Sequence, residues 1–174
     1  AALLMANIQA FLKIICRHGM NLDEATALIN DLITENTSDG KFITFCWAIM
    51  DEENKTINYV NAGHNPPLLI REGRIRKLDK GGLILGVMKT FRPYETELIE
   101  LQSGDILVMF TDGITEAMNK VGDEFSDERL ENLVLKQTDK KAAEVLLSIQ
   151  TEVQNFAAGT FQSDDITLVI IRVN

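Results

Sequence analysis

Aspartates stand at two places where an apolar segment of the sequence begins or ends. Asp112 and Gly113 follow the apolar run of residues 106–110, and Asp164 and Asp165 come just before the apolar run that closes the chain. Carboxylates held at rigid strand ends suit hard cations such as Mg²⁺ or Mn²⁺, which prefer oxygen ligands. The pattern predicts a divalent-cation site at Asp112 and Asp164, with Gly113 allowing the backbone to approach a ligand closely.

The same residues also have ordinary structural explanations. Asp-Gly after a strand is a common turn, and Thr111 or Asp112 could cap a helix over residues 114–119. Asp164 and Asp165 could equally lie in a solvated loop before the last strand. His64, in the segment NAGHNPP, is expected to be a turn histidine bonded to backbone. The local patterns leave these alternatives open.

Other patterns for nucleophilic or metal chemistry are absent from the sequence. There is no Gly-x-Ser-x-Gly and no phosphate-binding Walker loop. Two histidines are too few for a histidine metal cage, and Cys16 and Cys46 lack the spacing of zinc ligands. Two isolated cysteines favour a reducing compartment, so a cytoplasmic location is expected.

Hydrophobic periodicity predicts the elements that must position the aspartates. Two helices are predicted at residues 1–16 and 22–33, the second with a capping box formed by Asn21 and Glu24. Strands are predicted at residues 42–50, 56–63, 68–71, 74–78, 90–101, 106–110 and 164–173, and two further helices at residues 126–136 and 140–156. Hairpins between the strands indicate an antiparallel α+β protein rather than a doubly wound one.

Length and composition limit the class of protein. The chain has 174 residues, of which 45% are hydrophobic and 25% charged, as expected for one globular domain. The net charge of −9 repels phosphate backbones and anionic lipid, so nucleic acid and membrane surfaces are poor candidate partners. The sequence contains no apolar run of 18 residues, and we expect no membrane insertion.

Six motifs follow one another along the sequence: FITFCWAIMD, INYVNAGHNPPLLI, LILGV, SGDILVMFTDGITEAMN, DEFSDERL and SDDITLVIIRV. Together and in this order they resemble the SpoIIE/RsbU branch of the PPM-type metal-dependent serine/threonine protein phosphatases, and the resemblance runs from the first residue to the last. The resemblance implies that residues 1–174 form a single, partial domain. It also implies an α–β–β–α sandwich, in which helices flank two antiparallel sheets.

The resemblance further implies that the intact domain holds two or more Mn²⁺ or Mg²⁺ ions, whose sites are expected to be partly occupied or empty in this fragment. It also implies a metal-activated water that attacks phosphoserine or phosphothreonine. Asp112 matches the metal-binding Asp of the family's Thr-Asp-Gly motif, and Asp164 matches that of the Asp-Asp-x-Thr motif. Both are therefore expected to be metal ligands of the catalytic site. Asp165 stands where the wider family often has Asn. It is expected to help position the ligand Asp164 without binding the metal itself. His64 stands near a further metal position of animal-type relatives and is not expected to be a ligand.

The sequence departs from the family at its N-terminus. Family domains begin with strands that carry an acidic motif and Gly-Asp-x-Ser-Gly-His-Gly, whereas this sequence begins in the apolar helix that follows them. We therefore expect an N-terminally truncated fragment that hydrolyses phosphoserine very slowly or not at all, from a protein with an upstream sensor or receiver domain. The apolar excess of residues 1–16 predicts a homodimer through the N-terminal helices. A monomer in which this helix only covers a sheet is the alternative.

The expected function is dephosphorylation of a regulatory protein, such as an anti-anti-sigma factor of the STAS type. The alternative is a non-catalytic regulatory module, a degenerate phosphatase fold that binds a partner without hydrolysis. The presence of both Asp112 and Asp164 favours the enzyme, because a binding module has no physical need of both. A structural α+β domain with chance acidic turns is a third alternative.

Overall fold

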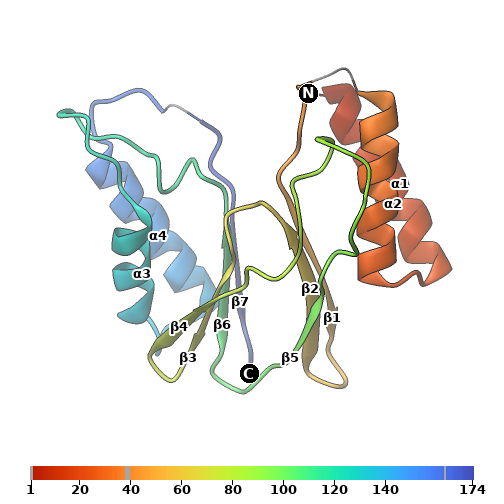
Figure 1. Cartoon of the computed structure of the whole chain (residues 1–174). Coiled ribbons are helices and arrows are strands. Elements are labelled where there is room, and N and C mark those ends of the chain that lie inside the picture. The colour runs from red at the N-terminus through yellow and green to blue at the C-terminus, as the bar shows by residue number, and fades with distance from the viewer. Residues whose placement is uncertain (1, 38–39, 163) are drawn as a thin grey trace. The chain divides into compact units, whose positions relative to one another are not determined.

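Two compact units make up the chain in the computed structural model (Figure 1). The structure describes residues 2–37, 40–162 and 164–174, without the side chains of residues 2–4, 7 and 16–18. Cys16 therefore lies outside the described side chains. Unit 1 comprises residues 1–64 and 79–100, and unit 2 comprises residues 65–78 and 101–174.

Unit 1 combines two helices with a three-stranded antiparallel sheet of order β1-β2-β5. Its elements are α1 (Ala2–His18), α2 (Leu22–Asn36), β1 (Phe45–Asp51), β2 (Thr56–Ala62) and β5 (Glu97–Glu100). The β1–β2 hairpin turns at Asp51, whose carboxylate accepts the backbone N–H groups of Glu53 and Asn54. These hydrogen bonds hold the pKa of Asp51 below its ordinary value, the bond from Asn54 having the largest effect. The consecutive acidic residues Asp51, Glu52 and Glu53 thus lie at a hairpin turn, where Glu52 and Glu53 are exposed to solvent.

α1 is the most apolar helix of unit 1, and only part of its surface is buried. Ile8 and Ile15 are buried in a cluster with Ile29 of α2, whereas Met5 and Ile14 are 54% and 57% exposed. A helix needs about 20 apolar residues to cross a bilayer. Within the described residues, no helix reaches the length and apolar character of a membrane span.

Asn30 ties α2 to the loop of residues 86–90. The Asn30 amide donates to the Met88 carbonyl and to the Thr90 hydroxyl, both at 2.9 Å. Its side-chain oxygen accepts the N–H of Gly86, also at 2.9 Å. Because Asn30 is only 2% exposed, these bonds satisfy a buried amide that would otherwise be costly.

Unit 2 places two helices against a four-stranded antiparallel sheet of order β4-β3-β6-β7. Its elements are β3 (Leu68–Arg71), β4 (Arg74–Lys77), β6 (Ile106–Phe110), α3 (Asp127–Leu135), α4 (Ala142–Phe156) and β7 (Leu168–Arg172). Apolar residues of β6 and α4, such as Val108, Ile149 and Val153, share one buried cluster. Figure 1 shows α3 and α4 lying along this sheet. The two units together confirm the predicted antiparallel α+β class.

Two predicted local features are wrong. Of the strand predicted at residues 90–101, only β5 forms, because Pro93 has no N–H to donate and the Thr90 N–H is bound by Asp31 of α2. The capping box predicted at Asn21 and Glu24 is also absent, because the Asn21 side chain makes no cap hydrogen bond. The first turn of α2 instead closes through the backbone bond from Ala25 to Asn21.

Candidate functional site

Asp112 lies in a tight turn just beyond β6. Its carbonyl oxygen accepts the N–H of Glu116 at 2.8 Å and the hydroxyl of Thr115 at 3.3 Å. The turn does not continue as a helix, so the alternative that Thr111 or Asp112 caps one is wrong. The Asp112 side chain is half-buried, and its carboxylate has no hydrogen-bond or ion-pair partner within the described residues.

Asp164 and Asp165 lie in an exposed loop ahead of β7. One carboxylate oxygen of Asp164 accepts the N–H of Asp165 at 2.7 Å, and the Asp164 carbonyl accepts the side-chain amide of Gln162 at 2.7 Å. The segment is therefore a solvated loop before the last strand, as the alternative to a metal site had it. The same exposure leaves the second carboxylate oxygen of Asp164 open to a cation from solvent.

Thr111 joins these two acidic segments. Its backbone N–H donates to the Thr167 carbonyl at 3.1 Å, and its hydroxyl donates to the Asp165 carbonyl at 3.0 Å. The same hydroxyl accepts the N–H of Thr167 at 2.9 Å. From the sequence, Thr111 is expected only as an alternative helix cap, since no local pattern points to a partner 54 positions away.

Gly113 makes the closest approach between the two segments. A Cβ atom at this position would lie 2.5 Å from the Asp165 carbonyl oxygen and 3.3 Å from that of Asp164. An alanine would therefore force the backbones apart. The sequence suggested that Gly113 lets the backbone approach a ligand, whereas in the structure Gly113 approaches the backbone of Asp165. Asp112 and Asp164 thus stand on backbone segments that touch, although 52 positions separate them in the sequence.

His64 belongs to unit 1 and lies in the predicted turn, but its ring contacts a side-chain hydroxyl rather than the expected backbone group. Its N–H donates to the Asn61 side-chain oxygen at 2.8 Å, and the Asn61 amide donates to the His64 carbonyl at 3.0 Å. The ring Nδ1 lies 3.1 Å from the Thr44 hydroxyl. These contacts explain His64 as a residue that closes the turn.

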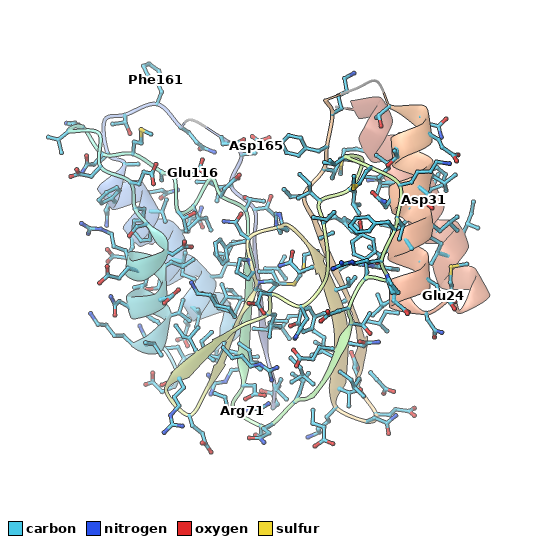
Figure 2. All side chains as sticks on the ribbon, viewed as in Figure 1. Glu24, Asp31, Arg71, Glu116, Phe161 and Asp165 are labelled. Atoms are coloured by element: carbon cyan, nitrogen blue, oxygen red, sulfur yellow. The ribbon has the colours of Figure 1, made fainter. Side chains whose placement is uncertain are left out.

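The donor set around Asp112 and Asp164 fits a hard cation in chemical type. Its side-chain donors are carboxylate oxygens, the preferred ligands of Mg²⁺ and Mn²⁺. Figure 2 shows Asp165 and Glu116 at the same end of unit 2. Within the described residues, no group of three or more His, Cys, Asp or Glu side chains is arranged to hold a metal ion. Asp112 and Asp164 therefore stay predicted metal ligands.

Comparison with known proteins finds one family over the whole chain. The family described as Stage II sporulation protein E (SpoIIE) matches residues 1–174. Phosphoserine phosphatase RsbU from Bacillus subtilis (strain 168) is 26% identical over 178 residues, which cover 99% of this chain and 51% of RsbU. The chain spans about half or less of the length of the curated relatives that it matches.

Solved structures share the fold. The PP2C phosphatase domain of SpoIIE from Bacillus subtilis, solved with a fragment of its regulatory domain, is 25% identical with a TM-score of 0.75. The match covers 95% of this chain and 48% of that one. The catalytic domain of the serine threonine protein phosphatase PstP, solved in complex with 2 manganese ions, is 14% identical with a TM-score of 0.68. That match covers 100% of this chain and 82% of the PstP chain.

These likenesses connect the fold to the sequence motifs. The structural neighbours are PP2C phosphatase domains, which confirms the PPM-type fold class expected from the order of the motifs. The family match covers both units and both acidic segments. The chain therefore belongs to the SpoIIE family.

Proposed function

We propose that the two units form one metal-dependent serine/threonine protein phosphatase domain with Asp112 and Asp164 as metal ligands of its catalytic site. The observation that carries this proposal is the contact of Gly113 with the carbonyls of Asp164 and Asp165, which brings the two acidic segments together. The phosphoserine phosphatase activity of RsbU and the two manganese ions in PstP support the proposal.

The residues of the site have distinct tasks in this proposal. Asp112 offers a carboxylate that binds no other described residue, and Asp164 offers the oxygen that does not accept the Asp165 N–H. Thr111 and Gly113 hold the two segments at a fixed separation. Mn²⁺ or Mg²⁺, when bound, supplies Lewis acidity that neutralises phosphoryl charge and activates water toward phosphorus.

The proposed substrate is a phosphoserine or phosphothreonine on a regulatory protein, such as an anti-anti-sigma factor of the STAS type in the cytoplasm. The name of RsbU supports phosphoserine as the group removed. With a net charge of −9, the chain itself repels a phosphoryl group, so cations at the acidic site are needed to attract one. Control by an upstream sensor or receiver domain is part of the same proposal.

Mn²⁺ titration followed by calorimetry tests the metal site directly. We expect the 174-residue chain to bind Mn²⁺, and Asp112→Asn and Asp164→Asn each to weaken binding at least tenfold. Asp139→Asn is the matched control, because Asp139 is an exposed aspartate of unit 2 outside the acidic segments. Equal binding by the chain and both site variants would contradict the assignment.

Hydrolysis by the 174-residue chain is proposed to be slow. Two carboxylates bind Mn²⁺ or Mg²⁺ weakly. In addition, a displacement of the attacking water by about 1 Å can lower the rate about a hundredfold. Release of phosphate from a phosphoserine peptide in millimolar Mn²⁺ is the measurement, with Asp112→Asn as the blank. A large rate that depends on Asp112 would contradict the slow rate but support the phosphatase.

The alternative function is a non-catalytic module with a phosphatase fold. The observation that favours it is the same small number of carboxylates, since two are few for a tightly held cation. Such a module would bind its partner protein equally well with and without Mn²⁺ and would release no phosphate. Mn²⁺-dependent phosphate release would exclude it.

A homodimer through the N-terminal helices belongs to the proposal as well. Met5 and Ile14 of α1 are more than half exposed, while Phe11 packs against the cluster of α1 and α2. Replacing both Met5 and Ile14 with lysine should leave the cluster intact and shift the mass in solution to that of a monomer. An unchanged mass would show that α1 makes no contact between copies.

A further inference from the structure

Two neighbouring cavities form a groove along α4 in unit 2. Their volumes are about 290 and 350 Å³, near the lower end of the range for ligand pockets. Both are lined by Val153 and Gln154 of α4 and by Gln162 and Ile166 of the segment that leads to β7. We call this surface the α4 groove.

The α4 groove is uncharged on a strongly acidic chain. Of the described residues that line either cavity, none carries a charged side chain, although 25% of the residues of the chain are charged. Besides apolar side chains, the lining contains the side-chain amides of three glutamines. Gln150 and Gln154 lie one helical turn apart on α4, and Gln162 lies in the segment that leads to β7. Amide groups donate and accept hydrogen bonds, as a peptide backbone does. The lining therefore suits an uncharged extended segment with apolar side chains.

The α4 groove is continuous with the acidic site. Gly113, which touches the carbonyls of Asp164 and Asp165, also lines one of the cavities. Gln162 lines both cavities, and its side-chain amide donates to the Asp164 carbonyl at 2.7 Å. A chain bound in the groove would thus pass within a residue or two of the acidic segments.

Large apolar side chains stand exposed at the rim of the α4 groove. Phe161 is fully exposed, and Met118 and Ile166 are 45% and 40% exposed. Figure 2 shows Phe161 pointing away from the ribbon at the end of unit 2 that carries Asp165 and Glu116. Apolar groups gathered beside a hollow are typical of a surface that a partner covers.

We propose that the α4 groove binds the stretch of the phosphoprotein substrate next to its phosphorylated residue, and that it selects apolar side chains there. This inference rests on the proposed function, because it places the phosphorylated residue at Asp112 and Asp164. The two cavities provide places for side chains on one side of an extended segment, and the glutamine amides bind its backbone. The groove thereby determines which phosphorylated sequences reach the acidic site.

Peptide binding without metal tests the groove apart from catalysis. Two fluorescent phosphoserine peptides are compared by polarisation in EDTA, one with leucines flanking the phosphoserine and one with serines at the same positions. We expect the leucine peptide to bind at least tenfold more tightly. Equal affinities of the two peptides would overturn the proposal.

Variants of the groove locate the binding surface. Ile166→Ser and Phe161→Ser should each weaken the leucine peptide about three- to tenfold, and Gln154→Trp should weaken it by filling the groove. Phe161 and Gln154 are exposed, so these changes should spare the fold, which circular dichroism would verify. Leu147→Ser is the control, because Leu147 is 61% exposed on the same helix and does not line the groove. A loss in the control equal to that in the groove variants would overturn the proposal.

Hydrolysis of the same peptides in Mn²⁺ separates this inference from the proposed function. A leucine preference in binding with no hydrolysis of either peptide supports the groove and favours the non-catalytic module over the phosphatase. Hydrolysis at equal rates for both peptides supports the phosphatase and overturns the groove. A leucine preference in both measurements supports the two proposals together.

Discussion

Two aspartates flank β6, and they differ in burial and in the partners of their carboxylates. Asp105 precedes the strand and is 1% exposed. Its carboxylate accepts two bonds from the Arg71 guanidinium, at 2.9 and 2.6 Å, and the N–H of Gln102 at 2.8 Å. Asp112 follows the strand, half-buried, with a carboxylate that binds no other described residue. Figure 2 shows Arg71 and Asp165 at opposite ends of unit 2.

Asp105 is a carboxylate that stabilises the fold, whereas Asp112 is a carboxylate that can still bind a ligand. The hydrogen bond from Arg71 to Asp105 raises the pKa of the Arg71 guanidinium, as expected for a paired group. A carboxylate that is fully bonded within the protein has no oxygen to offer a ligand. Asp112 and Asp164 keep that capacity at the other end of the sheet. Burial and pairing, rather than residue type, distinguish a residue that stabilises the fold from a candidate ligand.

The largest expected effect concerns Asp105 itself. Asp105→Ala removes the partner of a guanidinium and an acceptor of a backbone N–H, and should lower the free energy of unfolding by about 3 kcal/mol. Asp112→Ala should change it by less than about 0.5 kcal/mol, because no bond is lost. Urea denaturation of both variants measures the difference. Similar losses for the two variants would break the comparison.

A second effect concerns titratable groups that unit 1 keeps neutral. Burial raises the pKa of the Cys46 thiol to about 11 and, with a smaller contribution from Asp31, that of Tyr94 to about 12. Above pH 9 the unfolded chain loses these protons before the folded chain does, so stability falls as the pH rises. The loss for Cys46 alone between pH 8 and 11 should be roughly 2–3 kcal/mol.

Cys46→Ala serves as the test of this alkaline loss. The variant should show a shallower decline in urea stability between pH 8 and 11 than the parent chain. Tyr94→Phe should flatten the decline at still higher pH, since the Tyr94 hydroxyl donates to the Leu83 carbonyl and must give up that proton. Identical declines in Cys46→Ala and the parent would show that the thiol is not the group responsible.

A third effect concerns the contact that joins the acidic segments. Gly113→Ala should cost about 2 kcal/mol and weaken Mn²⁺ binding about tenfold, because the new Cβ would press against the Asp165 carbonyl. Gly104→Ala is the control, since its positive φ of 94° strains any side chain while nothing lies within 4 Å of the Cβ position. The control should lose stability but keep its Mn²⁺ affinity. Parallel changes in both properties for both variants would contradict the local role of Gly113.

The smallest effect is stabilisation by the metal itself. At a Mn²⁺ concentration ten times the dissociation constant, the gain in unfolding free energy should be about 1.4 kcal/mol. The gain should disappear in Asp164→Asn and with EDTA, and persist in Asp139→Asn. Thermal denaturation with and without Mn²⁺ measures it. A gain retained in Asp164→Asn would place the cation elsewhere.

The sequence predicted the strongly periodic elements and missed the contacts between distant residues. β2 and β6 were predicted because short apolar runs end at clear turns, and the motif order indicated the fold class. The prediction of a strand at residues 90–101 was wrong, because Thr90 forms hydrogen bonds with Asn30 and Asp31 of α2. The role of Thr111 was missed because its partner, Asp165, is distant in sequence. Asp112 and Asp164 were named as metal ligands from motif and local chemistry, and that assignment stays a prediction.

The bonds of Asn30 bear on how unit 1 opens. Its side chain satisfies three groups of residues 86–90, so α2 cannot separate from that loop without leaving a buried amide unpaired. Transient opening should therefore expose α2 and the loop in one cooperative event rather than two. In amide hydrogen exchange, the N–H of Gly86, bound to Asn30, would be protected to the same degree as the central amides of α2. A short loop without regular structure would then exchange as slowly as the helix that holds it.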